Sequence, residues 1–105
     1  MSKRETEVLE KVVRVIRDYL NPSKIILFGS RSADQAAPQS DFDLAVDLEK
    51  PSISELRKLK EAIEMHSGLY SVDVVFLKSV DEDFRNMVFS TGKCVYEREN
   101  SPSLQ

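Results

Sequence analysis

The segment from Asp41 to Leu48 has a large apolar residue at every second position, and this pattern constrains the fold more than any other feature of the sequence. Successive side chains of a β-strand point to opposite faces, so one face of this strand is buried. The large apolar residues share that face: Phe42, Leu44, Val46 and Leu48. The opposite face carries Asp41, Asp43 and Asp47 beside Ala45. We therefore expect a sheet with one covered face and one face that is at least partly open.

Three segments with helical spacing of apolar residues surround this strand. The first covers residues 5–20, the second follows Pro51 and ends near Gly68, and the third precedes Gly92. A serine followed three residues later by a glutamate predicts a capping box at the start of each helix. The three pairs are Ser2 with Glu5, Ser52 with Glu55, and Ser79 with Glu82.

Short apolar runs predict the remaining strands. Lys24 to Phe28 is apolar on both faces, which is typical of a central strand, Val72 to Leu77 is a further strand, and Cys94 to Tyr96 is a short edge strand. The alternation of helices and strands predicts an α/β or α+β fold, with a small mixed sheet covered by helices on one face. We expect one domain over residues 1–97 and a flexible tail over residues 98–105.

Composition narrows the classes of function. Fifteen basic and eighteen acidic residues give a net charge of −3, which argues against stable binding of nucleic acid. The longest apolar runs have four residues, far fewer than the roughly 20 that span a membrane. The charged first residues lack the apolar stretch of a secretion signal and predict a cytoplasmic location. A single cysteine, Cys94, excludes an intramolecular disulfide.

Two carboxylates stand close together on the open face of the alternating strand. Asp41 and Asp43 are two residues apart, so their Cα atoms lie about 6.5–7 Å from each other. Such a pair repels unless a cation lies between its members, and Mg²⁺ prefers oxygen ligands. Two such ions can together stabilise a phosphoryl or nucleotidyl transfer. A solvated strand face is the alternative interpretation.

Two neighbouring features favour the metal site. Gly29 and Ser30 directly follow a buried strand, where a tight turn can offer N–H groups and a hydroxyl to phosphate oxygens. Asp73 lies inside an apolar strand, where an unpaired acid is costly unless it meets a cation, a hydrogen-bond network or solvent. If the strand of Asp73 pairs with that of Asp43, the three acids form a cluster.

Taken together, Phe28-Gly29-Ser30, Asp41-Phe42-Asp43-Leu44 and Asp73 resemble the signature of the DNA polymerase β-like nucleotidyltransferases. The resemblance covers residues 1 to about 97 and is strongest to the minimal nucleotidyltransferases. It implies the nucleotidyltransferase fold and ATP as the substrate. Gly29, Ser30 and Arg31 would bind the nucleotide.

The resemblance also assigns catalysis and partners. Asp41, Asp43 and Asp73 would be the catalytic and metal-binding residues, with two Mg²⁺ ions. Many minimal members are antitoxins that neutralise a HEPN-domain toxin, in some cases by adding AMP to a tyrosine, which would make this chain part of a hetero-oligomer. Asp34 departs from the family pattern because it stands where members often have a second glycine.

Three functions are compatible with these features. The first is Mg²⁺-dependent transfer of AMP from ATP to a hydroxyl of a protein partner, which the three acids favour. The second is a nucleotide-binding module that neutralises its partner by complex formation alone, which Asp34 favours. The third, adenylation of a small molecule, would need a further substrate-binding domain.

Overall fold

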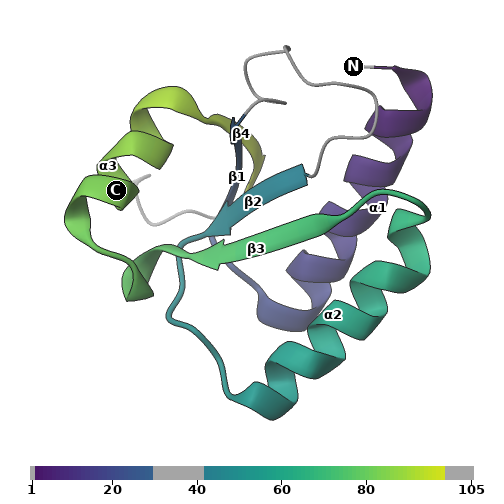
Figure 1. Cartoon of the computed structure of the whole chain (residues 1–105), viewed down its shortest axis with the longest axis horizontal. Helices are drawn as coiled ribbons and strands as arrows, with labels where there is room; N and C mark the ends of the chain where they lie inside the picture. Colours follow the sequence, from purple (N-terminus) through teal and green to yellow (C-terminus); the bar gives the residue numbers. More distant parts are fainter. Residues whose placement is uncertain (1, 30–41, 99–105) are drawn as a thin grey trace.

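Helices and strands follow one another along the chain in the order that the sequence predicts (Figure 1). The computed structural model describes residues 2–29 and 42–98. Its helices are α1 (Lys3–Leu20), α2 (Ile53–Ser67) and α3 (Glu82–Thr91), and a short 3₁₀ helix, η2 (Leu77–Ser79), precedes α3. Its strands are β1 (Lys24–Phe28), β2 (Phe42–Val46), β3 (Val72–Phe76) and β4 (Lys93–Glu97).

Capping boxes start the first two helices, as predicted. The Ser2 hydroxyl accepts from the backbone N–H of Glu5 at 3.2 Å, and the Glu5 carboxylate accepts from the Ser2 N–H at 2.7 Å. Ser52 and Glu55 make the same reciprocal pair at the start of α2. Asn21 ends α1 in the left-handed conformation, with φ of 51°.

The start of α3 differs from the prediction. Asp81 is the N-cap, and its Oδ1 accepts from the backbone N–H of Phe84 at 2.8 Å. Ser79 belongs to η2, and its hydroxyl accepts from the N–H of Lys50 at 2.9 Å. The predicted cap at Ser79 is therefore wrong, because an aspartate at the helix start satisfies a free N–H and adds a favourable charge to the helix dipole.

The strands form one mixed sheet in the order β3-β2-β1-β4. Strand β1 pairs antiparallel with both β2 and β4, which confirms its central position, whereas β2 pairs parallel with β3. Among the described strands β3 is therefore an edge strand, and its paired neighbour β2 carries the alternating acids. The α/β fold class with a mixed sheet is confirmed.

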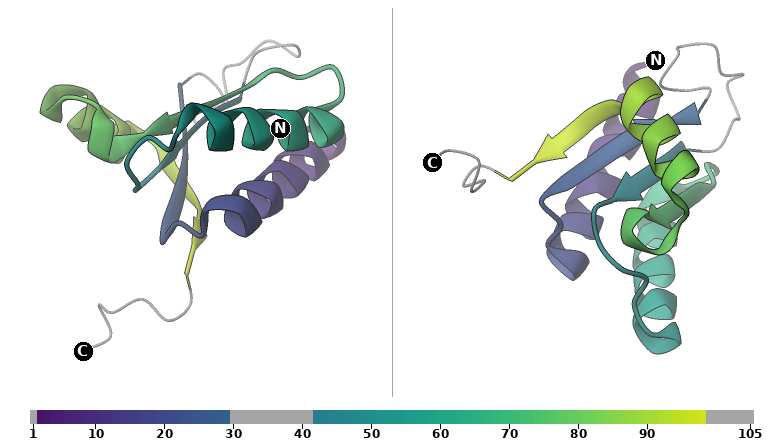
Figure 2. Two further views of the ribbon diagram at one scale, coloured as in Figure 1. Left: turned by 90° about the horizontal axis from the view of Figure 1, so that it is seen from below. Right: turned by 90° about the vertical axis from the view of Figure 1, so that its left-hand side faces the viewer.

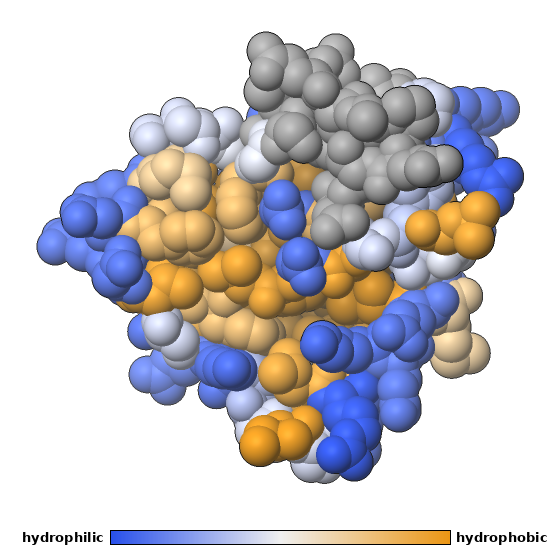
Figure 3. Space-filling model, viewed as in Figure 1, coloured by the Kyte–Doolittle hydropathy of each residue, from blue (hydrophilic) through white to orange (hydrophobic). Residues whose placement is uncertain are grey.

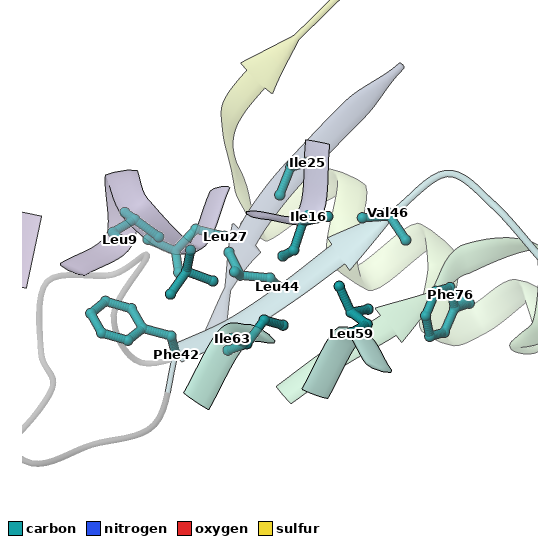
Figure 4. Packing of buried hydrophobic residues seen from close by; sticks show 11 residues of the cluster. Leu9, Ile16, Ile25, Leu27, Phe42, Leu44, Val46, Leu59, Ile63 and Phe76 are labelled. Carbon is teal, nitrogen blue, oxygen red and sulfur yellow. The ribbon is translucent and has the colours of Figure 1, made fainter. Parts of the chain in front are cut away.

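Helices lie on both faces of the sheet (Figure 2). Helices α1 and α2 cover the face that carries Phe42, Leu44 and Val46, and together with β1 they form the larger core (Figure 4). Helix α3 packs its buried Val88 on the second face, against Ile26 and its neighbours. Coverage of one face only was the expectation, and α3 departs from it because β1 is apolar on both faces and its second face must also be buried.

The second face is covered only in part. Phe84 of α3 meets Phe28 at the end of β1 edge-to-face, with ring centroids 5.9 Å apart. Met87 and Phe89, on the same helix, remain 39% and 50% exposed, so Met87 does not point inward as its spacing predicts. No helix among the described residues is long and apolar enough to cross a membrane.

The last strand continues into a residue that is held in place. Arg98, the first residue of the predicted tail, donates its backbone N–H to the Ser23 carbonyl at 2.8 Å. Its guanidinium also donates to the Asn21 carbonyl at 2.8 Å. Residues 99–105 of the predicted tail lie outside the described part of the chain.

Asp47, the last acid of the alternating segment, has a structural role. Its Oδ1 accepts from the backbone N–H groups of Ser23 at 3.0 Å and Lys24 at 3.2 Å, and its Oδ2 accepts from the Ser23 hydroxyl. Partial burial raises the pKa of Asp47, but the hydrogen bonds from Ser23 and Lys24 favour the charged form and together lower this pKa below its ordinary value of 3.8. Asp47 thereby fixes the loop that enters β1.

The lowered pKa makes a prediction about acid stability. A carboxylate with a lowered folded-state pKa stabilises the protein above its unfolded-state pKa, and this contribution is lost as pH falls through the folded value. Asp47→Asn should therefore lower the free energy of unfolding at pH 6, and this loss should disappear as the pH falls through the folded-state pKa of Asp47. Urea titrations between pH 2.5 and 7 measure this, with Ser23→Ala, which keeps both backbone donors, showing a smaller loss. A loss that stays constant over this pH range would contradict the assigned role.

Candidate active site

The described part of the chain contains three of the predicted site residues. Gly29 directly follows β1, Asp43 is the second residue of β2, and Asp73 is the second residue of β3. The other predicted site residues lie outside the described residues: Ser30, Arg31 and Asp41. Asp34, the departure from the family pattern, lies outside them as well.

Strand register brings the three described residues together. Asp43 pairs with Asp73 across the parallel ladder, and with Phe28, which precedes Gly29, across the antiparallel ladder. Adjacent strands lie about 4.8 Å apart, so the two aspartates start from neighbouring Cα positions and leave the sheet on the same face. Ala45, two residues after Asp43, packs in the core on the α3 side, which identifies that face as the one with the acids.

The turn at Gly29 fits closely around Asp43. Gly29 has φ of +79°, a conformation that favours glycine, and a Cβ added to it would lie 2.5 Å from Oδ2 of Asp43. The missing side chain therefore leaves space that the carboxylate fills. Close approach of backbone to this acid is a specific reason for glycine at this position.

The two carboxylates differ in exposure. Asp43 is half-buried between β1 and β3, whereas Asp73 is exposed on the edge strand. The sequence required Asp73 to meet a cation, a hydrogen-bond network or solvent, and in the structure its side chain meets solvent. Like charges on neighbouring strands repel each other. Two such carboxylates can bind a cation, or one of them can accept a proton from a reactant.

The donor set fits a hard cation. Asp43 and Asp73 offer carboxylate oxygens, the ligands that Mg²⁺ prefers. Among the described residues no group of three or more His, Cys, Asp or Glu side chains forms a metal-binding cluster. Asp41, two residues before Asp43, would complete the predicted set and lies outside those residues. The three-acid metal site therefore stays a prediction.

Sequence reasoning missed a groove beside the site. The groove has a volume of about 850 Å³ and is lined by all of β3, by one side of α2 and by Lys50. The apolar run at Val72 to Leu77 suggested a buried strand, but β3 lies at the sheet edge and most of its residues are only half-buried. Its exposed Asp73 was the one local signal that this strand meets solvent.

Comparison with known proteins identifies the family. The sequence matches the polymerase β nucleotidyltransferase domain over residues 10–101. This chain belongs to the polymerase β-type nucleotidyltransferase family. The predicted family and enzyme class are confirmed, because this match spans most of the chain.

Two similar proteins are named as protein adenylyltransferases. MJ1379 of Methanocaldococcus jannaschii is 32% identical over 81 residues, which are 74% of this chain and 80% of that protein. MntA of Haemophilus influenzae is 32% identical over 92 residues, 86% of this chain and 81% of that protein. Both carry a name that specifies a protein as the acceptor of the nucleotide.

Solved structures share the fold. A toxin–antitoxin crystal structure with AMP-PNP contains a chain that is 26% identical, with a TM-score of 0.70 over 90% of this chain and 77% of that one. A chain of a second structure, a tri-AMPylated HEPN toxin of Shewanella oneidensis in complex with an MNT antitoxin, is 23% identical to this chain. Its TM-score is 0.66, over 96% of this chain and 78% of that one. The similarity to this second structure confirms the fold.

Gly29→Ala tests the fit of the turn around Asp43. The positive φ should cost about 1–3 kcal/mol of unfolding free energy, and the added Cβ should displace the carboxylate. We expect affinity for Mn²⁺, used in place of Mg²⁺, to fall at least tenfold in calorimetric titration. Gly68→Ala is the matched control, because Gly68 also has positive φ but nothing lies within 4 Å of an added Cβ. Equal Mn²⁺ affinity in both variants would show that Gly29 does not shape the site.

Proposed function

We propose that this nucleotidyltransferase transfers AMP from ATP to a hydroxyl of a partner protein and acts as the antitoxin of a HEPN-type toxin. The observation that carries the proposal is the direct pairing of Asp43 with Asp73 beside the Gly29 turn. Two similar proteins named as protein adenylyltransferases support AMP and a protein as the two substrates.

The proposed reaction transfers AMP from ATP to the acceptor hydroxyl. The acceptor hydroxyl oxygen forms a bond to the α-phosphorus of ATP, the bond from that phosphorus to the α–β bridging oxygen breaks, and pyrophosphate leaves. Asp73, exposed at the sheet edge, accepts the hydroxyl proton. Asp43, with Asp41, would hold Mg²⁺, which neutralises the charge of the triphosphate when bound. Gly29, Ser30 and Arg31 would bind the phosphates.

The positions of the two described acids favour this division of roles. Asp43 is half-buried and flanked by backbone on both sides, which suits a fixed ligand that must not move during transfer. Among the described strands β3 has one neighbour, and Asp73 is exposed, so a hydroxyl carried by a second protein can approach it. A protein acceptor is therefore sterically compatible with the site.

The partner class is part of the proposal. The similar chain at 26% identity belongs to a toxin–antitoxin pair crystallised with AMP-PNP. The complex of an MNT antitoxin with a tri-AMPylated HEPN toxin shares the fold and supplies the kind of acceptor to test. We infer that this chain modifies a HEPN-domain protein encoded beside it.

Intact-mass spectrometry tests the reaction. Incubation with the HEPN-domain protein, ATP and Mg²⁺ should add one or more AMP groups to that protein. Asp43→Asn should slow the addition at least about 100-fold, since it removes a charge from the centre of the site. Asp83→Asn is the control, because Asp83 is an exposed acid in the first turn of α3 and belongs to none of the paired strands.

The same experiment distinguishes AMP transfer from the alternative, which is neutralisation of the toxin by binding alone. A stable complex that inhibits the toxin, with no AMP adduct in the wild type, would overturn the enzymatic proposal and leave neutralisation by binding alone. Equal rates in wild type and Asp43→Asn would show that this carboxylate is not part of the machinery.

A further inference from the structure

The groove beside β3 is continuous with the candidate active site. All five residues of β3 line it, and among them is Asp73. Leu59 and Ile63 of α2 form its apolar wall, and Figure 3 shows hydrophobic atoms in a band where Figure 1 places β3. A molecule in this groove would therefore lie beside the carboxylate that we assign as the proton acceptor.

The backbone of β3 faces this groove at alternate residues. The N–H of Phe42 donates to the carbonyl of Ser71 at 2.9 Å, which sets the phase of the parallel ladder. Residues 71, 73 and 75 consequently direct their backbone groups toward β2. Val72 and Val74 direct theirs outward, where an extended segment could accept and donate the next row of hydrogen bonds.

Charges are distributed unevenly along the groove. Helix α2 runs opposite to β3, so its Leu59 lies near Phe76 and its Ile63 nearer the start of β2 (Figure 4). Lys60 therefore lies toward the end of β3 and Glu64 toward its beginning. Lys50, also at the end of β3 through its bond to Ser79, adds a second positive charge there. An acidic residue of the occupant fits this end.

The positions of Asp73 and Lys60 on opposite faces of the sheet define how far apart the residues of an occupant that contact them must be. Asp73 lies on the face that α3 partly covers, whereas Lys60 belongs to a helix on the opposite face. Residues on opposite faces of a strand are separated by an odd number of positions. Three positions correspond to about 10 Å, the distance from Asp73 to the level of Phe76.

We propose that the acceptor protein docks as an extended segment that adds a strand to the edge of β3. Its hydroxyl-bearing residue lies opposite Asp73, and an acidic residue three positions away contacts Lys60. This inference rests on the proposed function, because the hydroxyl is the group that receives AMP. It specifies how that acceptor is recognised: backbone pairing gives affinity, and the charge sets the register.

Two blocked peptides probe the groove without requiring the natural partner. Thr-Tyr-Val-Thr-Glu-Val-Thr and its reverse place Glu three positions from Tyr for the two possible strand directions. In NMR hydrogen-exchange measurements, one of them should slow exchange of the Val72 and Val74 amides at least tenfold. The amides of Asp73 and Val75, which already face β2, serve as internal references and should change less than twofold.

Charge reversal tests the register. Lys60→Glu should weaken binding of that peptide at least fivefold, and a peptide with Lys in place of Glu should restore the affinity. Lys58→Glu is the matched control, because Lys58 is an exposed lysine of the same helix that does not line the groove. Equal effects of the two reversals, or no protection of Val72 and Val74 by either peptide, would overturn the proposal.

The experiments distinguish a wrong docking proposal from a wrong proposed function. AMP transfer to the HEPN-domain protein that is unchanged in Lys60→Glu, with no edge protection, would reject the groove and keep the function. Edge protection together with the charge-dependent affinity, but without AMP on the HEPN-domain protein, would support the docking surface and reject the transfer reaction.

Discussion

The parallel pairing of β2 with β3 is the interaction on which the candidate site depends. It places Asp43 opposite Asp73, while the antiparallel pairing of β2 with β1 brings the Gly29 turn to the same point. A slip of one residue would place a valine opposite Asp43 and turn Asp73 to the other face. The apolar side chains of β3 oppose this slip, because Val72, Val74 and Phe76, which pack against the larger core, would then turn away from it. The hydrophobic core therefore fixes the position of the acids.

Carboxylates from one alternating strand have opposite consequences for stability. Asp47 accepts three hydrogen bonds and strengthens the entry to β1, whereas Asp43 faces another acid across the ladder. Such an arrangement adds repulsion to a domain whose total stability is typically only about 5–15 kcal/mol. The protein tolerates it because the larger core lies on the opposite face. Exposure of Asp73 at an edge strand lowers the cost further and opens the site to a second protein.

Local patterns predicted what local interactions decide. The capping boxes at Ser2 and Ser52, the central position of β1 and the alternating faces of β2 are all confirmed. The cap of α3 was wrong because Asp81 competes successfully with Ser79 two residues earlier. The edge position of β3 and the groove beside it depend on pairing between strands distant in the sequence, and a run of valines has the same appearance in a central or an edge strand. For the same reason, the sequence predicted that Asp73 lies beside Asp43 only on the condition that their strands pair.

The central proposal is that strand register places Asp43 beside both Asp73 and the Gly29 turn, so that a cation held by Asp43 lies close to all three residues. Paramagnetic broadening by Mn²⁺ in a ¹⁵N-resolved NMR spectrum tests it most directly, because the effect falls steeply with distance from the ion. Substoichiometric Mn²⁺ should first broaden the amide signals of Gly29, Asp43 and Asp73, and should affect those of Asp81 to Asp83, a cluster of acids at the start of α3, less strongly. Broadening that begins at Asp81 to Asp83, or that affects all exposed acids equally, would contradict the claim.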